Sequence, residues 1–325
     1  MADEIYFVAG GLDCVVPVGN VVESTNYTVS GFSLTTIKTM PGASIGFNCP
    51  FIDQATGAPV TVTDFWTRFT VQNSDYAVGP VVQWLDSAGD AWVRLYQNSN
   101  FNFSLQQNVA GTWTAVGSPL LGTTNATFDV YIQIGSVGQI QFFINSISSG
   151  GFTGDTSAFG SIASLAAGFC DNTNQYFQQM IVANFNTIGH TVRTRAVTAA
   201  GANQEWTGPY GNVATYPLDP SQFITSAVAA ELNTYTGTTL SATPAGQIIR
   251  GVALGTYVRR DTTGPQNIKG VLDISSTEYD AAYNMANVGL GFSGNLAIWA
   301  NNPATSAPWA NITEANCDFG VKSVA

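Results

Sequence analysis

The chain has 325 residues and a formal net charge of -11 at pH 7, and only 10% of its residues are charged. Hydrophobic residues make up 45%, which is enough for the cores of two domains or of one large sandwich. Phosphate binding needs clustered Lys and Arg, whereas Lys38, Lys269 and Lys322 are the only lysines and lie far apart. The composition therefore argues against nucleic acid and against anionic membrane surfaces as partners.

The sequence carries no targeting or membrane-spanning signal. No run approaches the roughly 18 apolar residues of a membrane span, so we expect no membrane insertion. The first six residues are acidic and contain no basic segment, so we expect no signal peptide and synthesis in a cytosol. The cysteine spacings are typical neither of a zinc site nor of a redox pair. Free, buried thiols are expected, with one disulfide formed after release as the alternative, for Cys14, Cys49, Cys170 and Cys317.

Alternating apolar and polar residues, separated by turn residues, fill the first 190 positions and predict β-strands. The clearest hairpin spans residues 128–145, where apolar side chains recur at every second position on both sides of a glycine-containing turn. In residues 65–72 the odd-numbered side chains share one face, and Trp66 and Arg68 share the other. The strands expected in this half are residues 5–8, 14–16, 28–32, 65–72, 81–85, 92–97, 101–107, 111–116, 128–134, 140–144 and 176–188.

A second unit is expected to begin near residue 191. Residues 199–220 are rich in Gly, Asn and Pro and predict a long loop. Residues 222–235 contain the best helix candidate, although broken strands fit the same apolar positions, and residues 313–316 predict a single helical turn. The strands expected in this half are residues 191–198, 247–259, 267–275, 296–300 and 319–322.

This pattern of many short strands with turns between them is typical of a β-sandwich or jelly roll. We therefore expect an all-β fold with two parts. A jelly-roll sandwich domain with N-terminal strands occupies residues 1–190, and a smaller β-rich, sandwich-like domain occupies residues 191–325. No low-complexity linker separates them, so we expect them to pack closely.

Catalytic chemistry finds little support in the residue pattern. The sole histidine, His190, falls at the expected domain junction, and no G-x-S-x-G motif accompanies it. Glycoside hydrolysis requires two carboxylates that face each other across a cleft. No strand carries alternating acidic residues, and most, such as Asp53 and Asp155, fall in turns. We therefore expect no catalytic residues and a protein that is not an enzyme.

Two oxygen-rich loops are candidates for calcium. Asp86 and Asp90 flank a tight turn, and residues 171–174 form a similar segment of Asp, Asn and Thr. A hairpin turn between the strands at 81–85 and 92–97 explains the first pair without a metal. We therefore expect no metal and no other cofactor.

The aromatic residues are the candidates for contact with other molecules. Most large aromatics are expected in a core or an interface, because burial there stabilises them. Three tryptophans are candidates for glycan or interface contact: Trp66, Trp92 and Trp113. Trp66 is the best sugar-face candidate, since it opposes the apolar face of its strand, and packing between subunits is the alternative.

Several stretches resemble known families. Residues from about 45 to 190 resemble a concanavalin A-like (laminin G-like) jelly roll, through FWTRFTV (65–71), VVQWLDSAGDAWVRLYQ (81–97) and FDVYIQIGSVGQIQFFIN (128–145). The C-terminal stretch NNPATSAPWANITEANCDFGVKSV (301–324) is similar to a C-terminal signature of virion structural proteins of tailed bacteriophages. EWTGPYGNVATYPLD (205–219) also resembles that group.

The resemblance implies an assembled particle component without assigned catalytic residues. It favours a tail or tail-fibre protein in the virion, made in the host cytoplasm, with other virion proteins as partners and a symmetric homo-oligomer as its state. A capsid decoration protein on the head surface is the first alternative. A carbohydrate-binding module that contacts host-surface glycans is the second.

Overall fold

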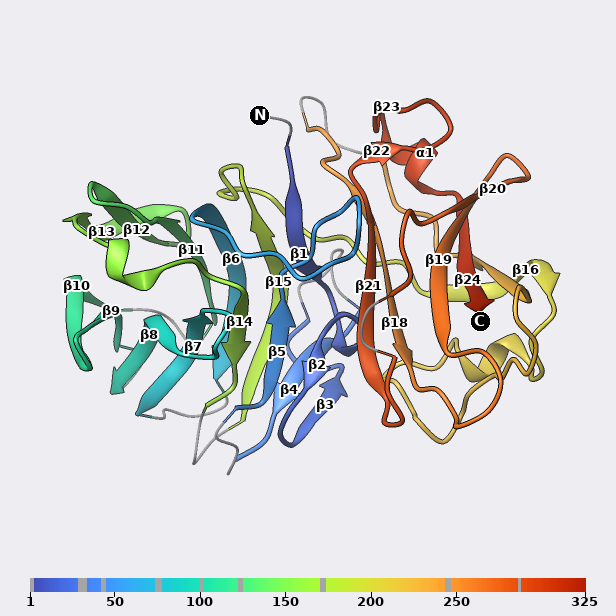
Figure 1. Ribbon diagram of the computed structural model, residues 1–325, viewed down its shortest axis with the longest axis horizontal. Coiled ribbons are helices and arrows are strands. Elements are labelled where there is room, and N and C mark those ends of the chain that lie inside the picture. Colours follow the sequence, from blue (N-terminus) through green and yellow to red (C-terminus); the bar gives the residue numbers. More distant parts are fainter. Residues whose placement is uncertain are drawn as a thin grey trace.

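The computed structural model describes residues 3–28, 34–41, 45–73, 78–99, 102–121, 125–169, 174–242, 247–285 and 288–325. Almost all regular structure in these residues is β-strand, which confirms the all-β prediction. The single described α-helix, α1 (Ile312–Ala315), is one turn long, and no described helix is long and apolar enough to cross a membrane. Figure 1 shows a sandwich of two sheets at one end of the molecule and a second group of strands at the other.

The sandwich consists of two antiparallel sheets. The eight-stranded sheet has the order β13-β12-β11-β6-β15-β4-β3, with β1 also paired to β15. The seven-stranded sheet has the order β10-β9-β8-β7-β14-β5-β2. The strands of the first are β1 (Ile5–Ala9), β3 (Val21–Ser24), β4 (Thr36–Thr39), β6 (Asp64–Asn73), β11 (Asn125–Gln133), β12 (Gly138–Ile144), β13 (Ile147–Gly154) and β15 (Gln175–Ala183). Those of the second are β2 (Val16–Pro17), β5 (Phe47–Pro50), β7 (Gly79–Leu85), β8 (Ala91–Ser99), β9 (Asn102–Val109), β10 (Thr112–Leu121) and β14 (Ser164–Ala167).

Aromatic side chains fill the space between these sheets. Phe69 and Phe128 pair across β6 and β11, with ring centroids 5.5 Å apart, and Phe142 of β12 stacks on Phe128 at 5.9 Å. Trp84 of the facing sheet is fully buried, and its indole nitrogen donates a hydrogen bond to Thr67 at 3.0 Å. Apolar and polar residues alternate along β6, β11 and β12, as predicted, because every second side chain of these strands enters this core.

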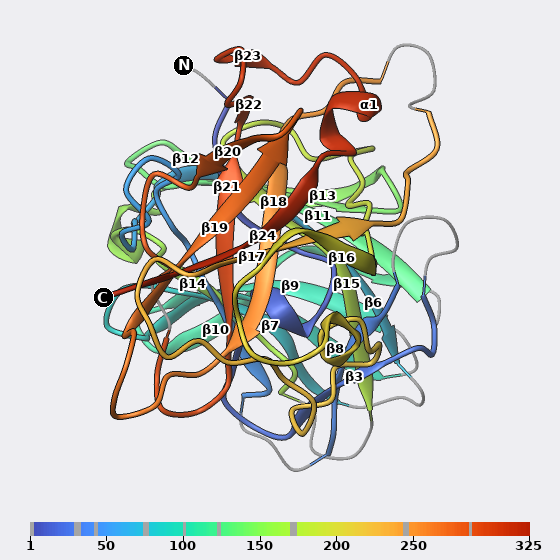
Figure 2. The ribbon, with the colours of Figure 1, turned by 90° about the vertical axis from the view of Figure 1, so that its right-hand side faces the viewer.

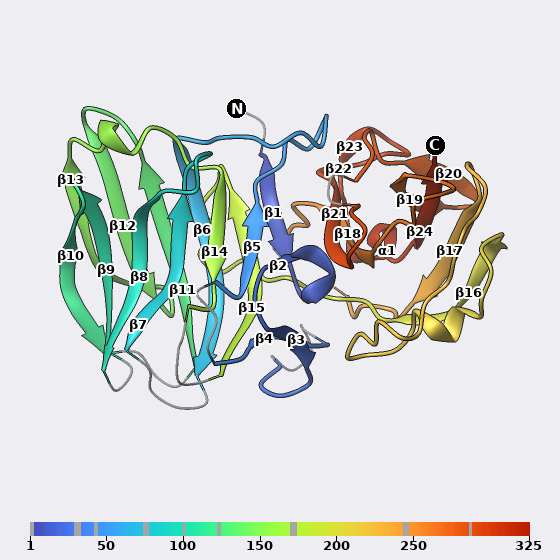
Figure 3. The ribbon, with the colours of Figure 1, turned by 60° about the horizontal axis from the view of Figure 1, so that its bottom comes forward.

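The second part contains a five-stranded sheet in the order β16-β17-β24-β19-β20 and a two-stranded sheet of β18 and β21. Figure 3 shows β18 and β21 lying between the five-stranded sheet and the sandwich, and Figure 2 shows the molecule from the end that carries the second part. The strands are β16 (Val197–Gln204), β17 (Leu232–Gly237), β18 (Val252–Val258), β19 (Asn267–Ile274), β20 (Thr277–Asp280), β21 (Ser293–Trp299), β22 (Asn301–Asn302), β23 (Ala307–Pro308) and β24 (Asp318–Val324). Short 3-10 turns are η1 (Leu12–Cys14), η2 (Ser157–Phe159) and η3 (Tyr210–Asn212).

The two parts share a hydrophobic core. Tyr283, Leu296 and Ile298 of the second part belong to the same cluster of buried side chains as the sandwich core. Gly294 at the start of β21 donates a backbone hydrogen bond to Val15 at 2.9 Å, and a Cβ atom at this glycine would lie 2.1 Å from the same carbonyl oxygen. The close approach requires glycine. The second part also has a separate cluster of buried side chains, which includes Leu272, Met285 and Trp309. The division of the chain at residue 190 stays a prediction.

Three local predictions for the second part were wrong. The expected loop at 199–220 begins inside β16, whose residues from Ala199 to Gly201 are too small to give an apolar alternation. The helix candidate at 222–235 is absent, and the alternative of strands is present in part, since β17 begins at Leu232 and pairs with β24. The strand expected at 247–259 begins only at Val252.

The predicted helical turn is present as α1. Asn311 caps it, since its side-chain oxygen accepts hydrogen bonds from the backbone nitrogens of Thr313 and Glu314 at 2.9 and 3.2 Å. The strand predicted at 28–32 lies, apart from residue 28, outside the described residues.

Candidate functional site

Two of the three candidate tryptophans lie on one surface, the outer face of the seven-stranded sheet. Trp92 and Arg94 of β8 point to the same side because they are two residues apart. The guanidinium carbon of Arg94 lies 4.1 Å from the centre of the Trp113 ring of β10, so Trp113 faces that side too. We name this surface the Arg94 face, which comprises Trp92, Arg94, Tyr96, Gln106, Asn108 and Trp113.

Arg94 is held in place at the centre of this face. Its guanidinium lies over the Tyr96 ring at 4.6 Å as well as over Trp113, and its Nε donates a hydrogen bond to Gln106 at 2.7 Å. The Gln106 amide in turn donates to the Ser104 hydroxyl at 3.1 Å. Burial lowers the pKa of Arg94, and the neighbouring Tyr96 opposes that shift. Arginine remains charged in proteins, so this face presents a fixed cation between two aromatic rings.

Amide side chains extend the Arg94 face across neighbouring strands. Arg94 pairs with Gln83 of β7 on one side and with Gln106 of β9 on the other. Gln83 pairs next with Ala166 of β14, which pairs with Asn48 of β5. Gln83, Gln106 and Asn48 are all half-buried. Rings, amides and one guanidinium therefore lie in adjacent positions on a single sheet surface.

Trp92 lies at one border of the Arg94 face and contacts the adjacent hairpin turn. Its indole nitrogen donates to Asp86 Oδ2 at 2.9 Å, and its ring stacks on Phe159 at 5.8 Å. Asp86 Oδ1 accepts hydrogen bonds from the backbone nitrogens of Ala88 and Asp90. Both oxygens of this carboxylate thus serve the hairpin. The described residues contain no group of three or more His, Cys, Asp or Glu side chains that could hold a metal ion. The second calcium candidate, residues 171–174, lies mostly outside the described residues.

The third tryptophan lies elsewhere. Trp66 is on the outer face of the eight-stranded sheet, where it stacks on Tyr131 at 5.1 Å and lies 5.7 Å from the Phe143 ring. We name these three residues the Trp66 patch. Burial raises the pKa of Tyr131 to about 12, with a further contribution from the nearby Asp64 carboxylate. The structure therefore separates Trp66 from Trp92 and Trp113, and the candidates form two sites on opposite sheets.

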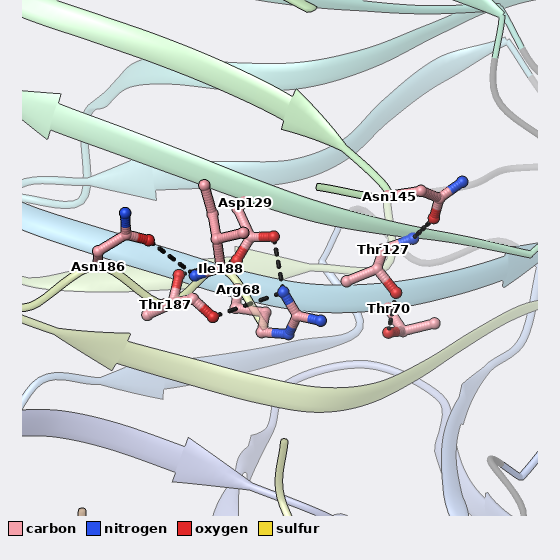
Figure 4. Close-up of polar contacts among 8 residues, drawn as sticks. All are labelled: Arg68, Thr70, Thr127, Asp129, Asn145, Asn186, Thr187 and Ile188. Carbon is pink, nitrogen blue, oxygen red and sulfur yellow. Dashed lines mark hydrogen bonds and ion pairs between the residues drawn. The ribbon is translucent and has the colours of Figure 1, made fainter. Parts of the chain in front are cut away.

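A buried ion pair lies beside the Trp66 patch (Figure 4). Arg68 Nη1 lies 2.7 Å from Asp129 Oδ2, and the Asp129 side chain is fully buried. The Thr187 hydroxyl donates to Asp129 Oδ1 at 2.9 Å, and the Thr187 carbonyl accepts from Arg68. The segment that carries Thr187 therefore covers this part of the sheet. Arg68 Nη1 and both Asp129 oxygens have partners, whereas Arg68 Nε is buried without a partner among the described residues. The pair has a structural role.

A large cavity lies between the sandwich and the second part. Its volume is about 1620 Å³, and both faces of β18 contribute to its walls. His190 lines it near the ring of Phe185, and burial together with the charge of Arg250 lowers the pKa of this histidine. Five of the ten basic residues of the chain line the cavity: Arg193, Arg195, Arg250, Arg259 and Arg260.

Two carboxyl groups lie together on the cavity wall. Glu23 accepts hydrogen bonds from Leu12 N and Thr35 Oγ1, both at 3.0 Å, and from Leu218 N at 2.8 Å. Burial raises the pKa of Glu23, and burial together with the Glu23 charge raises the pKa of Asp13 to about 7. Nothing in the sequence pattern indicated this pair, and one of the donors that hold Glu23, Leu218, lies 195 residues away.

The thiols agree with the expectation of free cysteines. Cys14, Cys49 and Cys317 form no disulfide, and Cys49 is fully buried. Burial is the largest cause that raises the pKa of each of these thiols. Cys170 lies outside the described residues.

Several solved structures of other proteins are similar to this chain. No protein-family model matches the chain, and no curated protein matches it. Among solved structures it is similar to an endo-β-1,4-glucuronan lyase from the fungus Trichoderma reesei, with 13% identity, a TM-score of 0.40, and coverage of 56% of this chain and 94% of that one. An alginate lyase from Chlorella virus has 7% identity, a TM-score of 0.39, and coverage of 52% and 91%. The globular domain of T. cruzi calreticulin has 9% identity, a TM-score of 0.41, and coverage of 55% and 87%.

These matches correct the prediction that the chain is not an enzyme. Polysaccharide lyases are among the solved proteins that it resembles, so that prediction was wrong. It rested on the missing pair of carboxylates that glycoside hydrolysis requires. Elimination from a uronate uses a base and a group that neutralises the carboxylate instead. The two packed antiparallel sheets themselves show that the chain has a jelly-roll sandwich fold.

Proposed function

We propose that the chain binds polysaccharide through the Arg94 face and does so as a structural component of a bacteriophage particle. The observation that carries the first half is the position of the Arg94 guanidinium, 4.1 Å from the Trp113 ring centre and 4.6 Å from that of Tyr96. Rings that border polar groups offer an apolar surface for the C–H face of a sugar. The amides of Gln83 and Gln106 offer donors and acceptors for its hydroxyl groups.

Charge also favours this assignment. Only 10% of the residues are charged, so most surface recognition must use uncharged groups. A charged guanidinium that already rests on two rings loses little side-chain entropy when it binds a ligand oxygen. Its planar fork matches a carboxylate, which favours sugars that carry one.

The first experiment measures binding of the intact chain to a panel of immobilised bacterial and algal polysaccharides. We expect saturable binding with dissociation constants between about micromolar and about millimolar. The double variant Arg94→Gln/Trp113→Ala should bind at least about tenfold more weakly, because it loses both the charge-assisted bond and the ring. A panel without any bound glycan, or a double variant that binds as well as the native chain, would refute the proposal.

A second candidate function is cleavage of a uronate polymer on the same face. It is favoured by the joint presence of Arg94, Gln106 and Tyr96. In such a β-elimination a base removes the proton beside the carboxylate, its electron pair forms a C=C bond, and the glycosidic C–O bond breaks as the leaving oxygen takes a proton. Arg94 and Gln106 would neutralise the carboxylate, and Tyr96 would transfer protons.

An absorbance assay for the unsaturated product tests this candidate. Native protein with oligouronate should generate the product, and Tyr96→Phe should lower the rate at least about a hundredfold while binding persists. Bound oligouronate that stays intact through prolonged incubation would eliminate the lyase candidate and leave the binding proposal standing.

The particle role rests on the sequence resemblance of residues 205–219 and 301–324 to phage virion proteins. A charge-poor β-rich body whose two parts share buried side chains suits a repeated rigid part, with other virion proteins and further copies of itself as partners. We propose a tail or tail-fibre location. Mass spectrometry and immunogold labelling of purified particles test it: label at low copy on the tail supports it, dense label over the head indicates capsid decoration, and absence refutes both.

A further inference from the structure

The cavity has a cationic, aromatic rim that the Arg94 face does not include. Arg259 follows β18 directly, and its guanidinium carbon lies 5.0 Å from the Phe292 ring centre and 5.8 Å from that of Phe223. Tyr257 stacks on Phe292 with centroids 5.5 Å apart. All four residues line the cavity, and Phe223 is 42% exposed. We name them the Arg259 rim.

This rim repeats the arrangement on the sandwich, since in both places an arginine rests on two rings. The sandwich pairs Arg94 with an indole and a phenol, and the second part pairs Arg259 with two phenyl rings. The chain has only ten basic residues, so two such arrangements use a fifth of them.

Arg259 has no acidic partner within the described part of the chain. The ion pairs found there use Arg68, Arg250 and Lys322. Five N–H donors of Arg259 are therefore available to a ligand.

The carboxylates that line the same cavity accept hydrogen bonds from other groups of the chain. Asp219 accepts hydrogen bonds from Ser221 and Gln222. Asp261 accepts from Thr262, and Glu23 is held by three donors. Asp13 accepts a hydrogen bond from Cys14 at 3.5 Å. Arg259 therefore lies on rings at the cavity rim, outside the ion pairs found among the described residues.

We propose that the Arg259 rim is a second saccharide site, specific for a sugar ring that carries a carboxylate. The guanidinium fork binds the carboxylate through two parallel hydrogen bonds. Phe223, with 42% of its surface exposed, covers the apolar face of the ring. The cavity of about 1620 Å³ has room for a chain of several sugar units. This inference deepens the proposed polysaccharide function, and two sites on one chain would raise the avidity for a long polymer.

The test isolates this rim by disabling the other site. The full-length variant Arg94→Gln/Trp113→Ala is titrated by calorimetry with an oligomer of glucuronic acid and with a neutral glucose oligomer of equal length. We expect the acidic oligomer to bind and the neutral one to bind at least about tenfold more weakly. Adding Arg259→Gln should weaken binding of the acidic oligomer at least about tenfold, and adding Phe223→Ala should also weaken it.

Lys269→Gln is the matched control, because it removes one positive charge from the same part of the chain without lining the cavity. Equal affinities for the Arg259→Gln and Lys269→Gln proteins overturn the inference, as do equal affinities for the acidic and neutral oligomers. Circular dichroism confirms that each variant is folded.

The two proposals fail separately. If the Arg94 face is not a site, the Arg94→Gln/Trp113→Ala protein binds as tightly as the native chain, while Arg259→Gln alone still weakens binding. If the Arg259 rim is not a site, Arg259→Gln has no effect in either background.

Discussion

Replacing Asp13 by Asn should make the protein more stable at alkaline pH and leave it nearly unchanged in acid. Asp13 lies on the cavity wall beside Glu23, and burial, followed by the Glu23 charge, raises its pKa from the ordinary 3.8 to about 7. Cys14 donates a hydrogen bond to Asp13 Oδ1, which an asparagine oxygen can still accept. The substitution therefore removes the ionisation and keeps the contact.

The sign and size follow from the two pKa values. Between about pH 4 and about pH 7 the unfolded chain has released this proton and the folded chain still holds it. The free energy of unfolding consequently falls as pH rises, by about 1.4 kcal/mol per pH unit from this group. The stabilisation is complete below the unfolded pKa and is lost once pH passes the folded pKa. The difference of about three units in the pKa of Asp13 sets an upper bound of about 4 kcal/mol.

Urea unfolding followed by circular dichroism measures this directly. The stability difference between Asp13→Asn and the native chain should be small near pH 4, grow through neutrality, and level off above about pH 8. Asp261→Asn, at an exposed position, controls for the loss of one negative charge. A difference that is flat across this range would refute the argument from burial.

Three further predictions concern stability and reactivity. Arg68→Met should lower the free energy of unfolding by about 3–5 kcal/mol, because it leaves the fully buried Asp129 charge without its cation. Replacing both Arg68 and Asp129 by apolar residues should lower it less. Equal losses of stability in the single and the double variant would count against the explanation. Cys14 and Cys49 should react slowly with a thiol reagent at neutral pH in the folded protein and fast in denaturant, because burial raises the pKa of both thiols. Fast labelling of the folded chain would contradict the burial of these two thiols. Gly294→Ala should destabilise the junction of the two parts, since its Cβ would lie 2.1 Å from a backbone oxygen, and an unchanged midpoint in urea unfolding would show that the junction can adapt.

The sequence predicted those strands whose two sides differ in environment. β6, β11 and β12 alternate because one side enters the core and the other faces outward. β14 has four consecutive buried residues, and β16 consists largely of small residues, so neither shows that alternation. These strands are specified by partners distant in sequence, which a local pattern does not contain.

The candidate site was predictable only in part. Trp92 and Trp113 could be selected as large aromatics, and the structure brings them onto one surface with Arg94. The role of Arg94 depends on the register of three strands, and a shift of one residue would turn its side chain to the other face. The Arg259 rim combines Phe223 with a strand more than 25 residues later, which no motif spacing indicates.

The central claim is that the Arg94 face, and not the Trp66 patch, contacts polysaccharide. The most direct test compares Trp113→Ala with Trp66→Ala, two identical substitutions on opposite sheets, in calorimetric titrations with the best ligand from the polysaccharide panel. The account predicts at least about tenfold weaker binding for Trp113→Ala and native affinity for Trp66→Ala. Native affinity for Trp113→Ala together with a loss for Trp66→Ala would contradict it and assign the contact to the other sheet.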